Sequence, residues 1–226
     1  MKLLTTGDAK TSLGESLSVL TGILYLSPET SNKLCPYASA QCKELCLVNS
    51  GRAEIFPAVN QARQRKTLWF LNDRSSFIAQ LKKDISALSR RANKRGMRAA
   101  VRLNGTSDII WERLIDFDEF PEVQFYDYTK IPLQFRRPSH NYHLTFSFSG
   151  TNLKACQEAL AAGFNVAMVF AKQIPESFSG VEVIDGSLHD VRFLDGKSGV
   201  IIGLCAKGKK ARDAAKRGSE FIISIN

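Results

Sequence analysis

Runs of apolar, β-branched and aromatic residues recur along the chain and alternate with segments of helical periodicity. Short runs of this composition, bounded by polar and turn residues, are typical of strands buried in a sheet. The pattern therefore predicts about eight strands spread over the whole chain. They are expected at residues 20–26, 97–103, 122–128, 142–148, 164–170, 181–185, 199–204 and 220–225.

Segments between these runs carry apolar residues at three- and four-residue spacing, which predicts amphipathic helices. Arg and Lys gather late in the second of them, where the helix dipole favours cations. A shorter turn and helix is expected within residues 104–114, with Thr106 or Ser107 as its N-cap. The four clear helical segments are 60–71, 75–95, 152–163 and 208–218.

The alternation of strands and helices indicates parallel βαβ units and an α/β fold. Eight strands favour a (β/α)8-like barrel, incomplete or irregular because several connections are too short for a helix. An open doubly wound sheet is the alternative. No linker rich in Pro, Gly or Ser divides the chain, so residues 1–226 are predicted to form a single domain.

The chain is basic, with 31 Lys and Arg against 22 Asp and Glu, a formal charge of +9. This balance favours a nucleotide or nucleic acid as partner, although surplus Lys on solvated helices also produces it. The sequence has no 18-residue apolar run and no signal peptide, so we expect a cytoplasmic protein with no membrane partner. No oligomeric state is predicted.

Three of the five cysteines, Cys35, Cys42 and Cys46, lie within the segment CPYASAQCKELC, here called the Cys loop (residues 35–46). In a reducing compartment, clustered cysteines more often bind metal or do chemistry than form disulfides. The spacing of Cys42 and Cys46 would place both thiols on one face of a helical turn. We therefore expect these three side chains to hold a [4Fe–4S] cluster whose fourth iron is open to substrate or S-adenosylmethionine. Zinc and simple burial are the alternatives.

Barrel enzymes carry their active sites where strands end, and polar residues follow several of the predicted strands. Asp108 suits a general base, or a helix N-terminus that favours negative charge. Tyr126 and Tyr128 could stack a base or pack a barrel rim. The residues predicted to be catalytic are Asn104, Asp108, Asp127, Lys130 and Asp185.

Three further polar residues are expected to contact a cofactor or substrate. Arg102 alternates with apolar neighbours along its strand and Ser147 ends another strand. Lys207 precedes a glycine turn and a basic helix, where backbone N–H groups and lysines could receive a phosphate.

The motifs LTTGDAKT, CPYASAQCKELCL, VRLNGTSDI, DYTKIP and GLCAKGK resemble the gene product 88 family of phage and prophage proteins. The resemblance spans nearly the whole chain and implies a phage protein working in host cytoplasm, but no particular reaction. Cys205 stands where the family ending is expected to carry a lysine, so Cys205 is not expected to be a required ligand. The Cys loop also resembles that of radical S-adenosylmethionine enzymes in cysteine number and place, although its C-x6-C-x3-C spacing differs from their C-x3-C-x2-C.

The leading hypothesis from the sequence is a phage-encoded iron–sulfur enzyme that modifies a nucleotide or nucleic acid. A second is a binder of nucleic acid or host protein, without catalysis, in which a zinc-bound or structural Cys loop shapes a basic surface. A third is a metal-independent hydrolase or glycosidase-type base-exchange enzyme that uses Asp108, Asp127 or Asp185.

Overall fold

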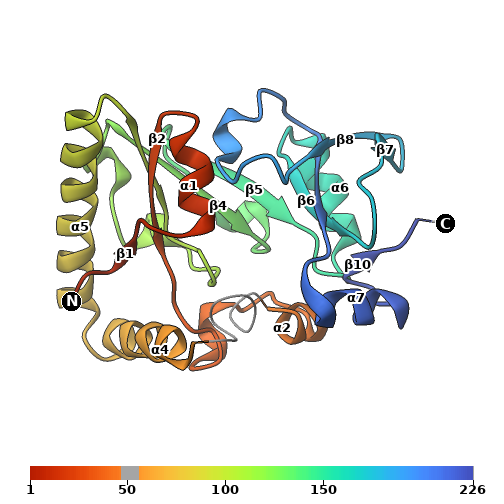
Figure 1. Cartoon of the computed structure of the whole chain (residues 1–226), viewed down its shortest axis with the longest axis horizontal. Coiled ribbons are helices and arrows are strands. Elements are labelled where there is room, and N and C mark those ends of the chain that lie inside the picture. Colours follow the sequence, from red (N-terminus) through yellow and green to blue (C-terminus); the bar gives the residue numbers. More distant parts are fainter. Residues whose placement is uncertain (47–55, 226) are drawn as a thin grey trace.

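The computed structural model describes residues 1–46 and 56–225, which form a mixed α/β fold around one mostly parallel sheet (Figure 1). The described strands are β1 (Leu4–Thr5), β2 (Val19–Leu24), β3 (Arg98–Arg102), β4 (Val123–Thr129), β5 (Tyr142–Ser147), β6 (Val166–Phe170), β7 (Ser177–Phe178), β8 (Val181–Asp185), β9 (Ile201–Cys205) and β10 (Ile222–Ile223). The described α-helices are α1 (Ala9–Glu15), α2 (Ala40–Glu44), α4 (Pro57–Asn72), α5 (Arg74–Lys94), α6 (Leu153–Ala161) and α7 (Gly208–Lys216).

The strands follow the order β1-β2-β3-β4-β5-β6-β9-β8-β7, and β10 pairs with β6. β1 runs antiparallel to β2 and β7 antiparallel to β8, whereas the other pairs are parallel. Within the described ranges the two edge strands do not pair with each other, so the sheet is open. The predicted α/β class is confirmed, but the predicted (β/α)8-like barrel is wrong.

The missing closure has a local cause in the connections between strands. β3 is joined to β4, and β4 to β5, through short 3₁₀ turns at Trp111–Arg113, Phe117–Glu119 and Leu133–Phe135. These turns are too short to supply the outer ring of helices that a barrel needs. The helix expected within residues 104–114 is also wrong, since only its last part forms a 3₁₀ turn.

Alternating side chains of the strands divide between two apolar layers. On one face, Leu20, Val101 and Phe125 pack in the same core cluster as the α5 residues Phe77 and Leu81. The other face packs against α1 and against residues 186–199, which we call the strap. There Val191 of the strap contacts a small apolar cluster that includes Val19, Ala100 and Tyr126.

The carboxyl ends of the parallel strands meet at one edge of the sheet, and α4, α2 and α7 lie along this edge (Figure 1). The backbone N–H of Phe221 and the Ser219 hydroxyl both donate to the Gln41 Oε1 of α2. The Lys210 ammonium of α7 donates to the carbonyl of Glu44, 2.6 Å away. The Cys loop is thereby tied to the C-terminal part of the chain. None of the described helices is long and apolar enough to cross a bilayer.

Candidate functional site

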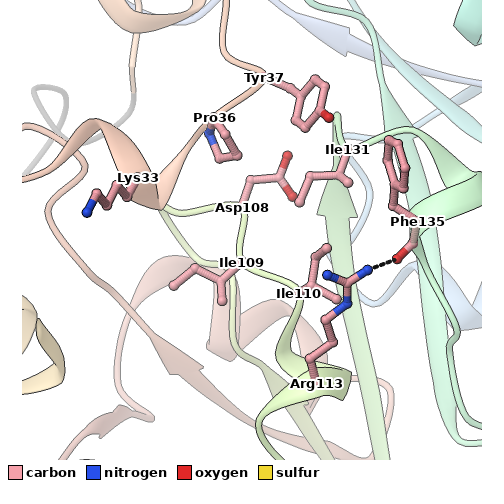
Figure 2. A pocket seen from close by; sticks show the side chains of 9 residues that line it. All are labelled: Lys33, Pro36, Tyr37, Asp108, Ile109, Ile110, Arg113, Ile131 and Phe135. Carbon is pink, nitrogen blue, oxygen red and sulfur yellow. Dashed lines mark hydrogen bonds between the residues drawn. The ribbon is translucent and has the colours of Figure 1, made fainter.

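A pocket of about 380 Å³ opens at the carboxyl edge of the sheet, at the loops that follow β2, β3 and β4 (Figure 2). Its two aromatic residues, Tyr37 and Phe135, are 44% and 43% exposed, which is high for large apolar side chains. Figure 2 shows the Asp108 carboxylate directed into the space near Tyr37 and Ile131. The lining residues are Lys33, Pro36, Tyr37, Asp108, Ile109, Ile110, Arg113, Ile131 and Phe135.

The loop that presents Asp108 is built around the side chain of Asn104. The Asn104 Oδ1 accepts hydrogen bonds from the Ser107 hydroxyl, the Ile109 backbone N–H and the Trp111 indole N–H, at 2.9, 2.9 and 3.0 Å. The Asn104 Nδ2 donates to the Ile109 carbonyl. With these hydrogen bonds the segment forms a compact turn in place of the expected helix. Asn104 therefore positions the loop that carries Asp108.

Gly105 brings this loop against the end of β2. A Cβ atom at this position would lie 2.7 Å from the Leu24 carbonyl oxygen and 2.7 Å from a methyl of Ile23. Real Cβ atoms do not approach backbone that closely, so the turn needs glycine here.

Asp108 is 6% exposed and its carboxylate is held by two hydrogen bonds. The Thr129 hydroxyl donates to Oδ1 at 2.8 Å, and the Lys130 backbone N–H donates to Oδ2 at 2.7 Å. Burial raises the pKa of Asp108 above its ordinary value, although the Lys130 charge and these hydrogen bonds lower it. A buried carboxyl with a raised pKa at a pocket is suited to acid–base chemistry.

Asp127 lies beneath the pocket and does not line it. Its Oδ1 accepts from the Asn104 backbone N–H at 2.7 Å, and its Oδ2 accepts from the Tyr142 hydroxyl at 2.9 Å. Burial raises the pKa of Asp127 to about 7, against the opposing effect of the Arg102 charge. In this arrangement Asp127 supports Asn104 and, through it, the Asp108 loop.

The Cys loop does not form the predicted metal centre. Among residues 1–46 and 56–225, no group of three or more His, Cys, Asp or Glu side chains is arranged to hold a metal ion. The helix α2 ends at Glu44, so Cys46 does not share a helical face with Cys42. Cys42 instead contacts the Lys130 ammonium, a positive charge that a metal ion would have to displace. The iron–sulfur prediction for Cys35, Cys42 and Cys46 is therefore wrong.

All five cysteines are free thiols, as the sequence favoured over disulfides. The Cys35 thiol lies 4.0 Å from the Thr106 carbonyl oxygen, and burial raises the pKa of Cys35 to about 12. Cys35 is thus a protonated, structural thiol at neutral pH.

Lys130 stands between the Cys loop and Asp108. Burial lowers the pKa of Lys130, but Cys42 and Asp108 raise it more, so its pKa lies above the ordinary value. Lys130 is accordingly charged at neutral pH and links the two loops.

The remaining predicted residues lie outside the pocket. The Arg102 guanidinium is buried on the strap face of the sheet, and its Nη1 lies 2.6 Å from the Asp190 carboxylate. Asp185 ends β8, which is separated from β3 by β4, β5, β6 and β9. The Asp185 carboxylate accepts a hydrogen bond from the Ser187 backbone N–H, and hydrogen bonding to Ser187 lowers its pKa.

Lys207 is exposed, precedes α7 and lies within electrostatic reach of Asp185. The Ser147 carbonyl accepts a hydrogen bond from the Asn152 amide at the end of β5. The structure thus brings Asn104, Asp108, Asp127 and Lys130 together and leaves Asp185 and Lys207 as a separate group. Their predicted functional roles stay predictions.

Asp108 is the one pocket residue that was a sequence candidate, and the charged and aromatic lining residues that were missed are Lys33, Tyr37, Arg113 and Phe135. Tyr37 lies inside the Cys loop, between Cys35 and Cys42. An available signal was the presence of aromatic residues in loops that follow predicted strands, since residues in such loops often contact ligands.

Comparison with known proteins gives one match. A family model described as Gene product 88 matches residues 2–223. No curated protein and no solved structure is significantly similar to the chain.

Proposed function

The chain belongs to the Gene product 88 family, and from that premise we propose that it is an enzyme acting on a nucleotide or nucleic acid bound in the pocket of Figure 2. The observation that carries this proposal is the position of Asp108, a buried carboxylate at a pocket flanked by two exposed aromatic rings. The proposed reaction is a hydrolysis or base exchange with Asp108 as the proton-transferring group.

The lining of the pocket suits a nucleotide in size and chemistry. A volume of about 380 Å³ falls in the range of small-molecule sites. Tyr37 and Phe135 offer faces for a base, and such stacking contributes roughly 1–3 kcal/mol per base. Lys33 and Arg113 supply positive charge for a phosphate, and the formal charge of +9 favours anionic partners generally.

The chemistry assigned to Asp108 follows from its environment. A raised pKa lets its carboxyl keep a proton at a higher pH than an exposed aspartate would, so it can protonate a leaving group. Thr129 and the Lys130 N–H fix the orientation of the carboxyl before substrate binds. Pre-orientation of this kind lowers the entropic part of the barrier.

The test incubates the protein with single-stranded DNA, single-stranded RNA and nucleoside monophosphates, and follows the products by mass spectrometry. Asp108→Asn should lower the rate of product formation by about 10²-fold or more, with little change in substrate affinity. Tyr37→Ala and Phe135→Ala should each weaken binding by about fivefold or more.

Asp185→Asn is the matched control, because this carboxylate is exposed and four strands away from the pocket loops. It should leave both rate and affinity unchanged. Equal rates in Asp108→Asn and wild type would exclude the catalytic assignment. Unchanged binding in both aromatic variants would exclude the pocket as the substrate site.

A second candidate, a nucleic-acid binder without catalysis, is favoured by the exposed basic residues of α7, which include Lys209 and Lys210. Binding without any product, lost when α7 lysines are changed but kept in Tyr37→Ala, would support this alternative over the enzyme.

A further inference from the structure

The strap covers a face of the sheet that carries several polar side chains. A covered sheet face is ordinarily apolar. Tyr126 of β4 pairs with His143 of β5, and Thr145 follows two residues later on the same face. Arg102 of β3 directly follows Val101, which pairs with Phe125, so it lies next to Tyr126 on that face. Arg192 of the strap lies over them, 1% exposed, and its charge influences both His143 and Tyr128.

Several buried polar atoms in this cluster have no hydrogen-bond partner among the described residues. Thr145 is 0% exposed and Arg102 is 5% exposed. Buried polar groups are almost always satisfied, so several such atoms in one place call for an explanation. The atoms are Arg102 Nε, His143 Nε2, Thr145 Oγ1 and Arg192 Nε, together with Arg192 Nη1 and Asp195 Oδ2 of two side chains that form an ion pair through Nη1 and Oδ1, 3.4 Å apart.

These atoms are mostly donors. The guanidinium nitrogens donate only, and the hydroxyl and imidazole are able to donate, whereas the Asp195 carboxylate is the one acceptor and is paired with Arg192. The donors come from β3, β5 and the strap. Guanidinium groups bind phosphate oxygens through strong, charge-assisted hydrogen bonds.

We propose that the strap face around Arg102, Thr145 and Arg192 is a binding site for the phosphate group of a small molecule. In the present state the Asp190 carboxylate of the strap lies 2.6 Å from Arg102 Nη1, in the place that a phosphate oxygen would take. Asp190 thus competes with the ligand, and phosphate binding requires the strap to release Arg102.

The attachment of the strap is consistent with such a movement. Few apolar side chains attach the strap to the sheet. Val191 packs in the cluster with Val19, Ala100 and Tyr126, and the ring centroids of Phe193 and Tyr126 are 5.4 Å apart. Gly196 and Gly199 have positive φ angles near one end of the strap, where only glycine changes conformation freely. Polar contacts hold its two ends, where the Gly186 N–H donates to the Gly203 carbonyl and the Asn165 amide donates to the Lys197 carbonyl. Between these ends the Arg102–Asp190 ion pair is a contact that an anion would replace with an equivalent one.

The experiment measures the binding of inorganic phosphate and pyrophosphate to the full chain by calorimetry, with unfolding temperature recorded for each variant. Thr145→Val removes an unpartnered hydroxyl, so the variant should fold at least as well as wild type yet bind phosphate about fivefold more weakly. Asp190→Asn removes the competing charge and should bind phosphate about threefold or more tightly.

This site does not depend on the proposed function. Arg90→Gln on the exposed face of α5 is the matched control and should leave phosphate affinity unchanged, whereas Arg113→Gln reports on any phosphate bound in the pocket instead. Phosphate binding that is lost in Arg113→Gln but kept in Thr145→Val would overturn the assignment. Wild-type affinity in both Thr145→Val and Asp190→Asn would also overturn it.

Discussion

Single side chains decide the geometry of the loop that carries Asp108. Asn104 uses its amide oxygen for three hydrogen bonds at once and its amide nitrogen for a fourth. From the sequence, Asn104 was predicted to be catalytic because helix capping did not account for it. In the structure, this side chain instead holds the loop together through hydrogen bonds, in a segment where the expected helix does not form.

Asn104→Ala should lower the free energy of unfolding by about 3 kcal/mol, because the buried Trp111 indole and the Ile109 N–H lose their acceptor. Urea denaturation measures the change. Asn72→Ala, at an exposed position at the end of α4, should change stability by less than about 0.5 kcal/mol. A similar small effect at Asn104 would contradict the role given to its amide.

Asp127 makes stability depend on pH in an unusual direction. Its pKa is about 7 in the folded state against an ordinary 3.8, so the folded protein binds more protons than the unfolded chain between these values. The contribution of Asp127 is fully present below pH 3.8 and is lost as the pH rises through 7, by at most roughly 1.4 kcal/mol per pH unit.

The dependence is measured by urea unfolding of wild type and Asp127→Asn at several pH values between 4 and 7. The uncharged variant should lose less stability than wild type as the pH rises across this window. Parallel curves for the two proteins would show that Asp127 does not titrate there.

Whole elements were predictable where periodicity alone defines them. The eight predicted runs coincide with β2 to β6, β8, β9 and β10, and the four helical segments coincide with α4 to α7. β1 and β7 were missed because each has two residues and lies outside the predicted apolar runs, whereas the equally short β10 lies within the run at 220–225. α1 was missed as well, and the helix after β3 was predicted wrongly because Ser107 satisfies Asn104 and does not cap a helix.

The approach of the β3 loop to β2 gives a test at the level of elements. Gly105→Ala should cost about 2–3 kcal/mol of stability, since the added Cβ would meet the Leu24 carbonyl and a methyl of Ile23. Gly7→Ala is the matched control, because a Cβ there meets nothing within 4 Å. Thermal unfolding distinguishes the two, and equal melting temperatures would contradict this packing.

For the whole molecule, the predicted α/β class is confirmed, whereas the predicted closed barrel is wrong and the pocket was not predicted. The sheet stays open because short 3₁₀ turns take the place of outer helices, and short antiparallel strands flank both ends of the parallel part. The pocket depends on strand order, because Tyr37 and Phe135 meet only when β2, β3 and β4 lie side by side. No local pattern in the sequence contains that information.

The net charge gives a prediction for the molecule as a whole. If a single-stranded nucleic acid is the partner, the logarithm of its affinity should fall linearly with the logarithm of salt concentration, by about 0.7 for each phosphate contacted. Fluorescence anisotropy with a labelled oligonucleotide measures the slope. A slope near zero would show that the charge of +9 does not serve nucleic-acid binding.

The contact between α2 and the C-terminal segment spans almost the entire chain, since Phe221 donates to Gln41 across 180 positions. During synthesis on the ribosome, the first strands and α5 emerge long before this contact is available. The loop bearing Tyr37 therefore lacks this support until Phe221 has been translated. A chain released before residue 221 would therefore contain most strands of the sheet but would lack the contact that supports the Cys loop.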